Sequence, residues 1–332
     1  MSLDANIRSS VCLPVICAPM FLVSGPDLVR EACKAGIMAG LPAQNSRNIE
    51  EFEAWLRDIS VSLTEHAATG ARIGPLAVNF GARLPVDELP GYLNICSRHG
   101  VTYLITVGRD PTAIVERAHD VGLKVFHDIT SIRFAEKAIK AQVDGLTCIG
   151  AGGGGHSGTI SHLALIRKVR TLFDGTIIMA GAISDGATIR ASEILGADLA
   201  YMGTRFIATV ESMAPQAYKD MLVSQTSADL AYTGKVAGVP GNWLVASLQR
   251  VGLDLSTMPD APEGAKRYIE LPEHLRPWRD IWSAGQGIDL IHDIPTVSTL
   301  VRQLRQEYVA ACNVPDMSDV ARLVDQADIA RL

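Results

Sequence analysis

The chain has 332 residues, of which 48% are hydrophobic and 20% are charged, which is the composition of a globular protein with a large core. Its net charge of −6 and the lack of any lysine- and arginine-rich run argue against a nucleic-acid partner, because phosphate backbones bind basic patches. No apolar run approaches the length of a membrane span, and the N-terminus lacks a signal-peptide pattern. We therefore expect a cytoplasmic protein with no membrane partner. The six cysteines lack metal-ligand spacing, so no metal site is expected.

Eight short apolar runs alternate with longer amphipathic stretches in the first 206 residues. They cover residues 13–18, 37–41, 76–80, 102–106, 124–128, 145–149, 176–180 and 199–202, and most begin 21 to 31 residues apart. This spacing fits one strand, one helix and two short loops, and near-continuous hydrophobicity is typical of parallel strands covered on both faces. The pattern predicts an α/β fold, a closed (β/α)8 barrel.

The intervals between these runs have helical character. Residues 27–36 and 187–195 carry apolar stripes at helical spacing, and glycines suited to helix C-termini follow at Gly36 and Gly196. After residue 206 the alternation stops and prolines become frequent. We expect a barrel core at 1–206, an inserted, mostly helical lid at 207–281, and a C-terminal return segment at 282–332. In the last part, residues 297–307 should form a helix that packs on the barrel, and a peripheral helix is expected beyond Pro315.

A glycine-rich loop follows the sixth predicted strand. Gly152 to Gly155 are consecutive glycines, and His156 and Gly158 come directly after them. Glycine is costly to order, so such a run indicates backbone with positive φ or a close approach to a flat ligand. The alternative is a flexible surface loop with an incidental histidine. Because the loop leaves the carboxyl end of a barrel strand, we interpret His156 as a general base beside a bound cofactor, and Gly155 as a cofactor contact.

Glycines also follow the seventh and eighth predicted strands, at Gly181 and Gly203. In (β/α)8 barrels these two loops commonly form a phosphate site, since backbone N–H groups and helix N-termini attract an anion. Ordinary loop glycines are the alternative. Their occurrence at both expected places predicts a phosphate-bearing ligand.

Three other predicted strand ends carry candidate ligand contacts. The first ends in Ala-Pro-Met at residues 18–20, where a flat ring could lie against the backbone. Asn79 and Asp128 are polar residues at the ends of the third and fifth runs, and each is either a ligand contact or a satisfied core group. His127 should point away from Asp128 by strand alternation, so we expect only one of the two to face the barrel lumen.

The chain resembles the nitronate monooxygenase family, formerly called 2-nitropropane dioxygenases, over roughly residues 10 to 310. The resemblance lies in Ala-Pro-Met at 18–20, Val-Asn at 78–79, Gly-Gly-His-Ser-Gly at 154–158, Ala-Gly-Ala-Ile-Ser-Asp-Gly at 180–186, Met-Gly-Thr-Arg-Phe at 202–206 and Ser-Ala-Gly-Gln at 283–286. It implies an FMN-dependent TIM barrel with a helical lid, in which His156 is the catalytic base. The cofactor contacts that it implies are Ala18, Pro19, Met20 and Asn79 at the flavin ring or ribityl chain, Gly181, Ala182, Gly203 and Thr204 at the phosphate, and Gln286 in the return segment.

The sequence departs from the family pattern at two of these positions. Relatives often carry a lysine or another residue where Asp128 stands, and Asp128 is kept as a candidate cofactor contact. Ala182 replaces a commoner glycine, which is tolerable because alanine still offers its backbone N–H.

The same scaffold and histidine loop occur in FMN-dependent enoyl-acyl-carrier-protein reductases and NAD(P)H:quinone reductases, so the motifs indicate cofactor better than substrate. The leading hypothesis is oxidation of alkyl nitronates, and of nitroalkanes, with O2 to a carbonyl compound and nitrite. The alternatives are a reductase that takes electrons from NAD(P)H, and a barrel that only binds a phosphorylated metabolite. The expected partners are a small-molecule substrate and O2, and the sequence leaves open the use of NAD(P)H and the formation of a homodimer.

Overall fold

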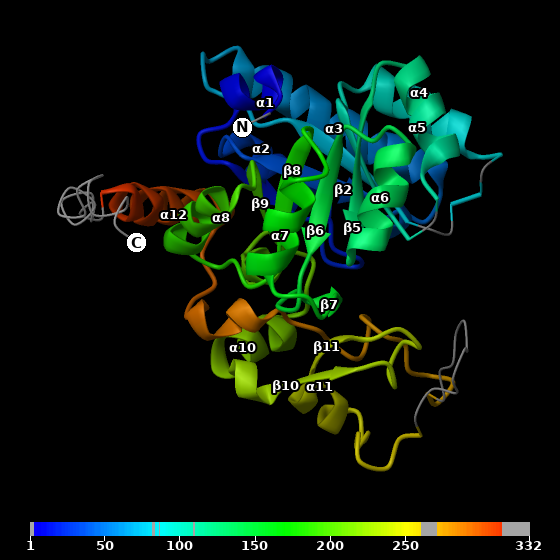
Figure 1. Cartoon of the computed structure of the whole chain (residues 1–332), viewed down its shortest axis with the longest axis vertical. Coiled ribbons are helices and arrows are strands. Elements are labelled where there is room, and N and C mark those ends of the chain that lie inside the picture. Colours follow the sequence, from blue (N-terminus) through cyan, green and yellow to red (C-terminus); the bar gives the residue numbers. More distant parts are fainter. Residues whose placement is uncertain (1–2, 82–83, 86, 109, 260–270, 314–332) are drawn as a thin grey trace, which may run out of the picture.

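Eight parallel strands form a closed barrel in the computed structural model, which describes residues 3–81, 84–85, 87–108, 110–259 and 271–313 (Figure 1). The strands are β1 (Val15–Cys17), β2 (Met38–Pro42), β3 (Leu76–Phe80), β4 (Tyr103–Val107), β5 (Lys124–Ile129), β6 (Gly145–Ile149), β8 (Thr176–Ala180) and β9 (Leu199–Met202). Each apolar run forms one of them, and β9 pairs with β1 to close the barrel. The predicted (β/α)8 barrel is confirmed, while the helix expected beyond Pro315 lies outside the described residues.

The barrel strands are buried because each has one face toward the barrel axis and one toward the helices. Ile16, Met38, Ala77 and Phe126 belong to the cluster inside the barrel. Ile7, on the short helix α1 (Ala5–Ser10), belongs to the same cluster and is fully buried. A larger cluster of aliphatic side chains joins the outer strand faces to the helices. These two layers explain why the strands read as continuous apolar runs.

Helices surround the barrel. They are α2 (Pro26–Lys34), α3 (Ile49–Ala67), α4 (Leu89–Arg98), α5 (Thr112–Asp120), α6 (Ile132–Lys140), α7 (His162–Arg170), α8 (Gly186–Leu195) and α12 (Val297–Cys312). The helix expected at 297–307 is confirmed as α12, which packs against both α8 and α2. It therefore completes the ring, and the lid is an insertion between β9 and this last helix.

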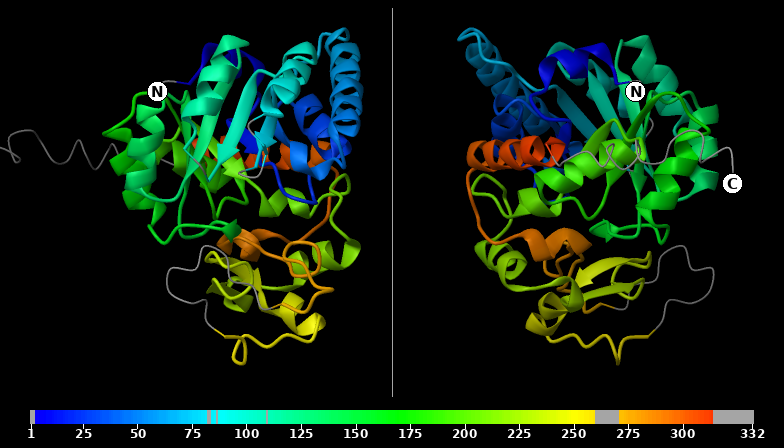
Figure 2. Two further views of the ribbon diagram at one scale, coloured as in Figure 1. Left: turned by 90° about the vertical axis from the view of Figure 1, so that its right-hand side faces the viewer. Right: turned by 60° about the vertical axis from the view of Figure 1, so that its left-hand side comes forward.

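The lid lies across one end of the barrel (Figures 1 and 2). Its elements are α10 (Gln216–Ser224), α11 (Val245–Arg250), β10 (Leu230–Thr233), β11 (Gly241–Leu244) and the short 3-10 helices η2 (Ser227–Asp229) and η3 (Gln286–Leu290). One apolar cluster, which includes Trp243, lies within it, and a second, which includes Tyr218 and Trp282, joins it to Val23 on the barrel side. None of the described helices is both long and apolar enough to cross a membrane.

A three-stranded antiparallel sheet in this region was not expected from the sequence. Its order is β10-β11-β7, and β7 is the two-residue strand Gly155–His156 within the glycine-rich loop. Gly241 pairs with His156 and Asn242 with Gly155. The lid is therefore tied by backbone pairing to the loop that carries His156.

Candidate active site

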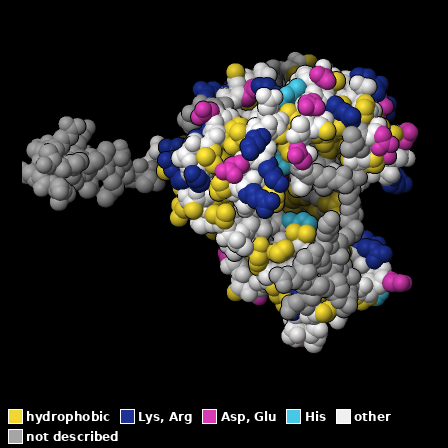
Figure 3. Space-filling model, turned by 45° about the vertical axis from the view of Figure 1, so that its right-hand side comes forward, with side chains coloured by type: hydrophobic (Ala, Val, Ile, Leu, Met, Phe, Trp, Pro, Cys, Tyr) yellow, Lys and Arg dark blue, Asp and Glu magenta, His cyan; other side chains and the backbone are white. Residues whose placement is uncertain are grey.

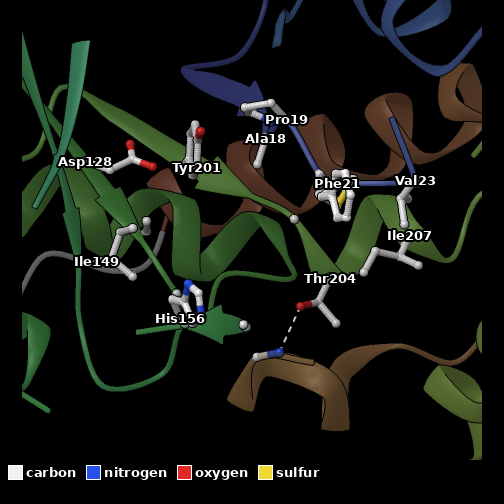
Figure 4. Close-up of a pocket in the computed structure, with 18 of the residues that line it drawn as sticks. Ala18, Pro19, Phe21, Val23, Asp128, Ile149, His156, Tyr201, Thr204 and Ile207 are labelled. Atoms are coloured by element: carbon white, nitrogen blue, oxygen red, sulfur yellow. Dashed lines mark hydrogen bonds between the residues drawn. The ribbon is translucent and has the colours of Figure 1, made fainter. Parts of the chain in front are cut away.

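A cavity of about 320 Å³ lies at the carboxyl ends of the barrel strands, and lid residues form part of its wall. Its size is within the range of small-molecule and cofactor sites. Figure 3 shows a hollow between the barrel and the lid, with hydrophobic and histidine side chains at its edge. In Figure 4, Asp128 and Tyr201 from the barrel strands lie on one side of the cavity, with His156 and Thr204 across from them.

The glycine-rich loop fills a space too narrow for side chains. Gly155 has a φ of +66°, and a Cβ at Gly154 would lie 2.8 Å from the backbone nitrogen of Gly285. A Cβ at Gly152 would lie 2.7 Å from the Cβ of Ala182. Asn242 of β11 donates to the carbonyl oxygen of Gly153 at 2.6 Å. The run of glycines thus combines a positive φ with a close approach to the protein's own atoms, and the expected approach to a flat ligand stays a prediction.

His156 faces the cavity from this loop, and its ring lies perpendicular to that of Trp278, with 5.0 Å between the ring centroids. The side chain stays accessible along the cavity, but its protein surroundings still remove enough water to lower the pKa of the imidazole. A neutral imidazole is the form that can accept a proton. The geometry therefore suits a base.

The loops after β8 and β9 reach the cavity together. Gly181 has a φ of +115° and Ala182 a φ of +56°, so the chain turns sharply there. Gly203 precedes the short helix α9 (Thr204–Ile207), whose N-terminal end faces the cavity. The Thr204 hydroxyl accepts a hydrogen bond from the backbone N–H of Gly285 at 2.9 Å. These backbone groups offer an anion site of the kind found in many barrels.

Helix α8 begins just after the loop that carries Gly181, and protein groups occupy part of its N-terminus. Asp185 caps the helix through a capping box with Thr188. The N–H of Gly186 donates to a carboxylate oxygen of Glu307 at 2.9 Å. Protein carboxylates therefore already accept hydrogen bonds from the N–H groups of Gly186 and Thr188 at this terminus.

Asp128 is the residue of the His127–Asp128 pair that faces the main cavity, as strand alternation predicted for one of them. Among the described residues, neither its carboxyl oxygen Oδ1 nor the neighbouring Thr147 hydroxyl, both buried, has a hydrogen-bond partner. Burial raises the pKa of Asp128 to about 7, and the nearby Thr147 side chain acts in the opposite direction by lowering it. His127 instead contacts the Thr106 hydroxyl through Nδ1 at 2.8 Å, and burial lowers its pKa to about 4.

Most of the predicted site residues lie together. The cavity is lined by Ala18, Pro19, Met20, Asn79, Asp128, Gly155, His156, Gly181, Ala182, Gly203 and Thr204. Gln286 is the exception, because its side chain is exposed and its backbone N–H donates to the carbonyl oxygen of Gly152. Its neighbours Gly285 and Gly287 line the cavity instead. Asn79 lines the cavity and also donates a hydrogen bond to the carbonyl oxygen of Ile105 at 3.0 Å. It is therefore a hydrogen-bonded core amide that lies within reach of a ligand.

Several residues that line the cavity were not predicted from the sequence. Tyr201 lies in the middle of β9, and Gln44 donates to Asn79 Oδ1 at 3.2 Å from a 3-10 helix, η1 (Ala43–Asn45), after β2. A tyrosine within an apolar strand was a detectable signal for Tyr201. Trp278 and Tyr218 come from the lid, and no local pattern marked them.

A closed (β/α)8 barrel with a cavity at its strand ends, and a histidine presented into it, defines a barrel enzyme. The family model described as nitronate monooxygenase matches residues 91–307. The chain therefore belongs to the nitronate monooxygenase family, and it is a flavin-dependent oxidoreductase.

Among similar proteins, a nitronate monooxygenase of Pseudomonas aeruginosa is 28% identical, over 88% of this chain and 96% of the relative. A Rhodococcus jostii protein named as a carboxyl-CoA dehydrogenase is 27% identical, over 72% of this chain and 65% of that protein. The fold is similar to that of FabK from Thermotoga maritima, with a TM-score of 0.71 and 21% identity over 94% of this chain and 98% of the other. The fold is also similar to that of a nitroalkane oxidase from Streptomyces ansochromogenes, with a TM-score of 0.69 and 24% identity over 93% of this chain and 99% of the other.

Proposed function

We propose that this protein is an FMN-dependent nitronate monooxygenase that oxidises alkyl nitronates, and their parent nitroalkanes, with O2 to a carbonyl compound and nitrite. The observation that carries the proposal is His156, a base of lowered pKa that faces the cavity from a loop held by the lid. The similarity to a named nitronate monooxygenase across nearly the whole length of both chains supports the same conclusion.

The residues at the cavity fit FMN at both of its ends. For the phosphate, Gly203 and Thr204 begin α9, and a Cβ at Gly203 would meet nothing closer than the Met20 sulfur at 3.5 Å, so the backbone there is approachable. For the flavin ring, Ala18 and Pro19 offer a flat apolar surface. The unpartnered Oδ1 of Asp128 needs a polar neighbour, and the edge of a flavin carries both donors and acceptors.

Bound FMN would supply the electron transfer that links substrate oxidation to O2. The protein's own part is proton removal and positioning. A neutral nitroalkane must lose the proton on the carbon beside the nitro group, and His156 would accept it on an unprotonated ring nitrogen. A nitronate has already lost that proton and needs only to be bound and oriented.

The proposal is tested by purifying the protein, measuring its flavin absorbance and identifying the released cofactor. The holoprotein is then mixed with an alkyl nitronate, and O2 consumption and nitrite release are followed. We expect bound FMN and nitrite formed only in the presence of O2. A colourless protein that takes up no FMN would exclude both this function and the reductase below.

A second candidate is a reductase in which NAD(P)H reduces the flavin, which then reduces a quinone or an enoyl thioester. A specific observation favours it: a second cavity of about 200 Å³ adjoins the first and shares Asp128 and His156 with it, so a second ligand could reach the same residues. Anaerobic mixing separates the candidates. Rapid bleaching of the flavin by NADH supports the reductase, and bleaching by a nitronate alone supports the monooxygenase.

A further inference from the structure

No hydrogen bond from the part of the chain that the structure describes fixes the orientation of the His156 imidazole. Within the described residues, its imidazole ring takes part in no hydrogen bond and no ion pair, and loss of water is the only cause of its lowered pKa. Catalytic bases are commonly held by a third polar group that fixes the ring and its tautomer. Here the closest ring contact comes from Trp278, perpendicular to the imidazole at 5.0 Å between centroids.

Trp278 has a strained backbone. Its φ is +63°, which is rare for a bulky residue and persists only where the surroundings enforce it. Two contacts hold the backbone of Trp278 in this conformation. Its backbone N–H donates to the carbonyl oxygen of Ile281 at 2.8 Å, and its ring packs against that of the fully buried Trp243, with 5.1 Å between the ring centroids. Strain of this kind gathers at functional sites, and Trp278 lines the cavity.

The lid therefore contacts His156 in two independent ways. Its strand β11 pairs with the backbone of His156, and its Trp278 contacts the side chain. We propose that Trp278 is a positioning residue, which fixes the direction of the His156 imidazole and shields one side of it from water. The idea deepens the proposed function and rests on it only where turnover is concerned.

Other titratable groups share the cavities with His156 and could influence its protonation. Asp128 on β5, Tyr201 on β9 and Tyr218 on α10 face the main cavity, while Asp110, His127 and Lys137 line the adjoining one. None of them causes the lowered pKa of His156. A variant at Trp278 should therefore change that pKa through hydration and leave these groups in place.

The experiment compares the holoprotein with its Trp278→Ala and Trp278→Phe variants. The pKa of His156 is read from the NMR titration of its ring protons, assigned with His156→Gln. We expect Trp278→Ala to raise this pKa toward the ordinary value near 6.5, and Trp278→Phe to raise it less, since phenylalanine keeps an aromatic ring. Trp55→Phe, in α3, is the matched control and should leave it unchanged.

Turnover gives a second readout. With FMN retained, Trp278→Ala should lower kcat/KM for a neutral nitroalkane by on the order of 100-fold, the effect of a base displaced by about 1 Å. Turnover of the nitronate, which needs no base, should fall much less. The low-pH limb of the nitroalkane profile should move with the pKa of His156.

The possible outcomes are distinct. An unchanged His156 pKa and unchanged nitroalkane turnover in a Trp278→Ala protein that keeps FMN would overturn the proposal. Loss of folding or of FMN in both variants would also overturn it, because Trp278 would then be a structural residue. If the pKa shifts while the wild-type protein oxidises neither nitroalkane nor nitronate, the proposed function fails and the positioning role stands.

Discussion

The variant His156→Ala distinguishes two substrates that differ by one proton. At pH 7 a histidine with the ordinary pKa near 6.5 is about three quarters neutral, and the lowered pKa of His156 makes this fraction larger. Most molecules therefore carry a competent base, so its removal should cost most of the contribution of general-base catalysis. We expect kcat/KM for a nitroalkane to fall by about 10²–10⁴, which corresponds to roughly 3–5 kcal/mol in the barrier.

The fold and the cofactor should survive this change. The pairing of His156 with Gly241 uses backbone atoms, which alanine keeps. The assay measures nitrite release from a nitroalkane and from its pre-formed nitronate at one pH, with FMN content determined for each preparation. His66→Ala, at the end of α3, is the control for loss of a histidine remote from the cavity. Equal losses on the two substrates would refute the assignment of His156 as the base.

Three further variants test other parts of the site. Gly203→Val should give a folded protein with little FMN, because Gly203 has an ordinary φ of −102° and its Cβ would be in ordinary contact with the Met20 sulfur at 3.5 Å, while the valine would block the approach of the phosphate to the backbone; full flavin occupancy would place the phosphate elsewhere. Thr204→Val removes the acceptor for the N–H of Gly285 and should cost about 0.5–1.5 kcal/mol in urea unfolding, with a smaller loss of FMN than Gly203→Val. Asp128→Asn should change how stability depends on pH. The folded-state pKa of Asp128, about 7, lies above its ordinary 3.8, so the folded protein holds this proton more tightly and the wild type loses stability as pH rises from about 4 to about 7. Between about pH 4 and pH 7 the asparagine variant should lose less folding stability than the wild type, by up to about 4 kcal/mol. Identical urea midpoints for the two proteins at pH 5 and at pH 8 would contradict this.

The sequence alone determined the barrel and much of its cavity. Strands buried on both faces must be continuously apolar, so runs such as residues 76–80 and 176–180 were recognisable locally, and both match strands of the structure. Residues at the carboxyl ends of parallel strands meet at one end of a barrel whatever the details of packing. For that reason the sequence alone predicts that Asn79, Asp128 and His156 lie together, as they do at the cavity.

The glycines at the cavity serve different purposes. Gly203 has an ordinary φ of −102°, and a Cβ there would lie 3.5 Å from the Met20 sulfur at the cavity wall. Gly181 is the glycine that needs its conformation, with a φ of +115° and a Cβ position 2.6 Å from the nitrogen of Gly153. A sequence shows that a glycine is present, while only the structure shows which of its properties is used.

The tertiary structure alone decided how the lid meets the catalytic loop. Strand β7 has two residues, and its partner β11 follows about 85 residues later, so no local periodicity could reveal the pairing. The contact of Trp278 with His156 spans an even longer stretch of chain, and the occupation of the α8 terminus by Glu307 joins residues 121 positions apart. Local patterns record burial and backbone preference. Contacts between distant segments depend on how whole elements pack, and that information is spread over the entire chain.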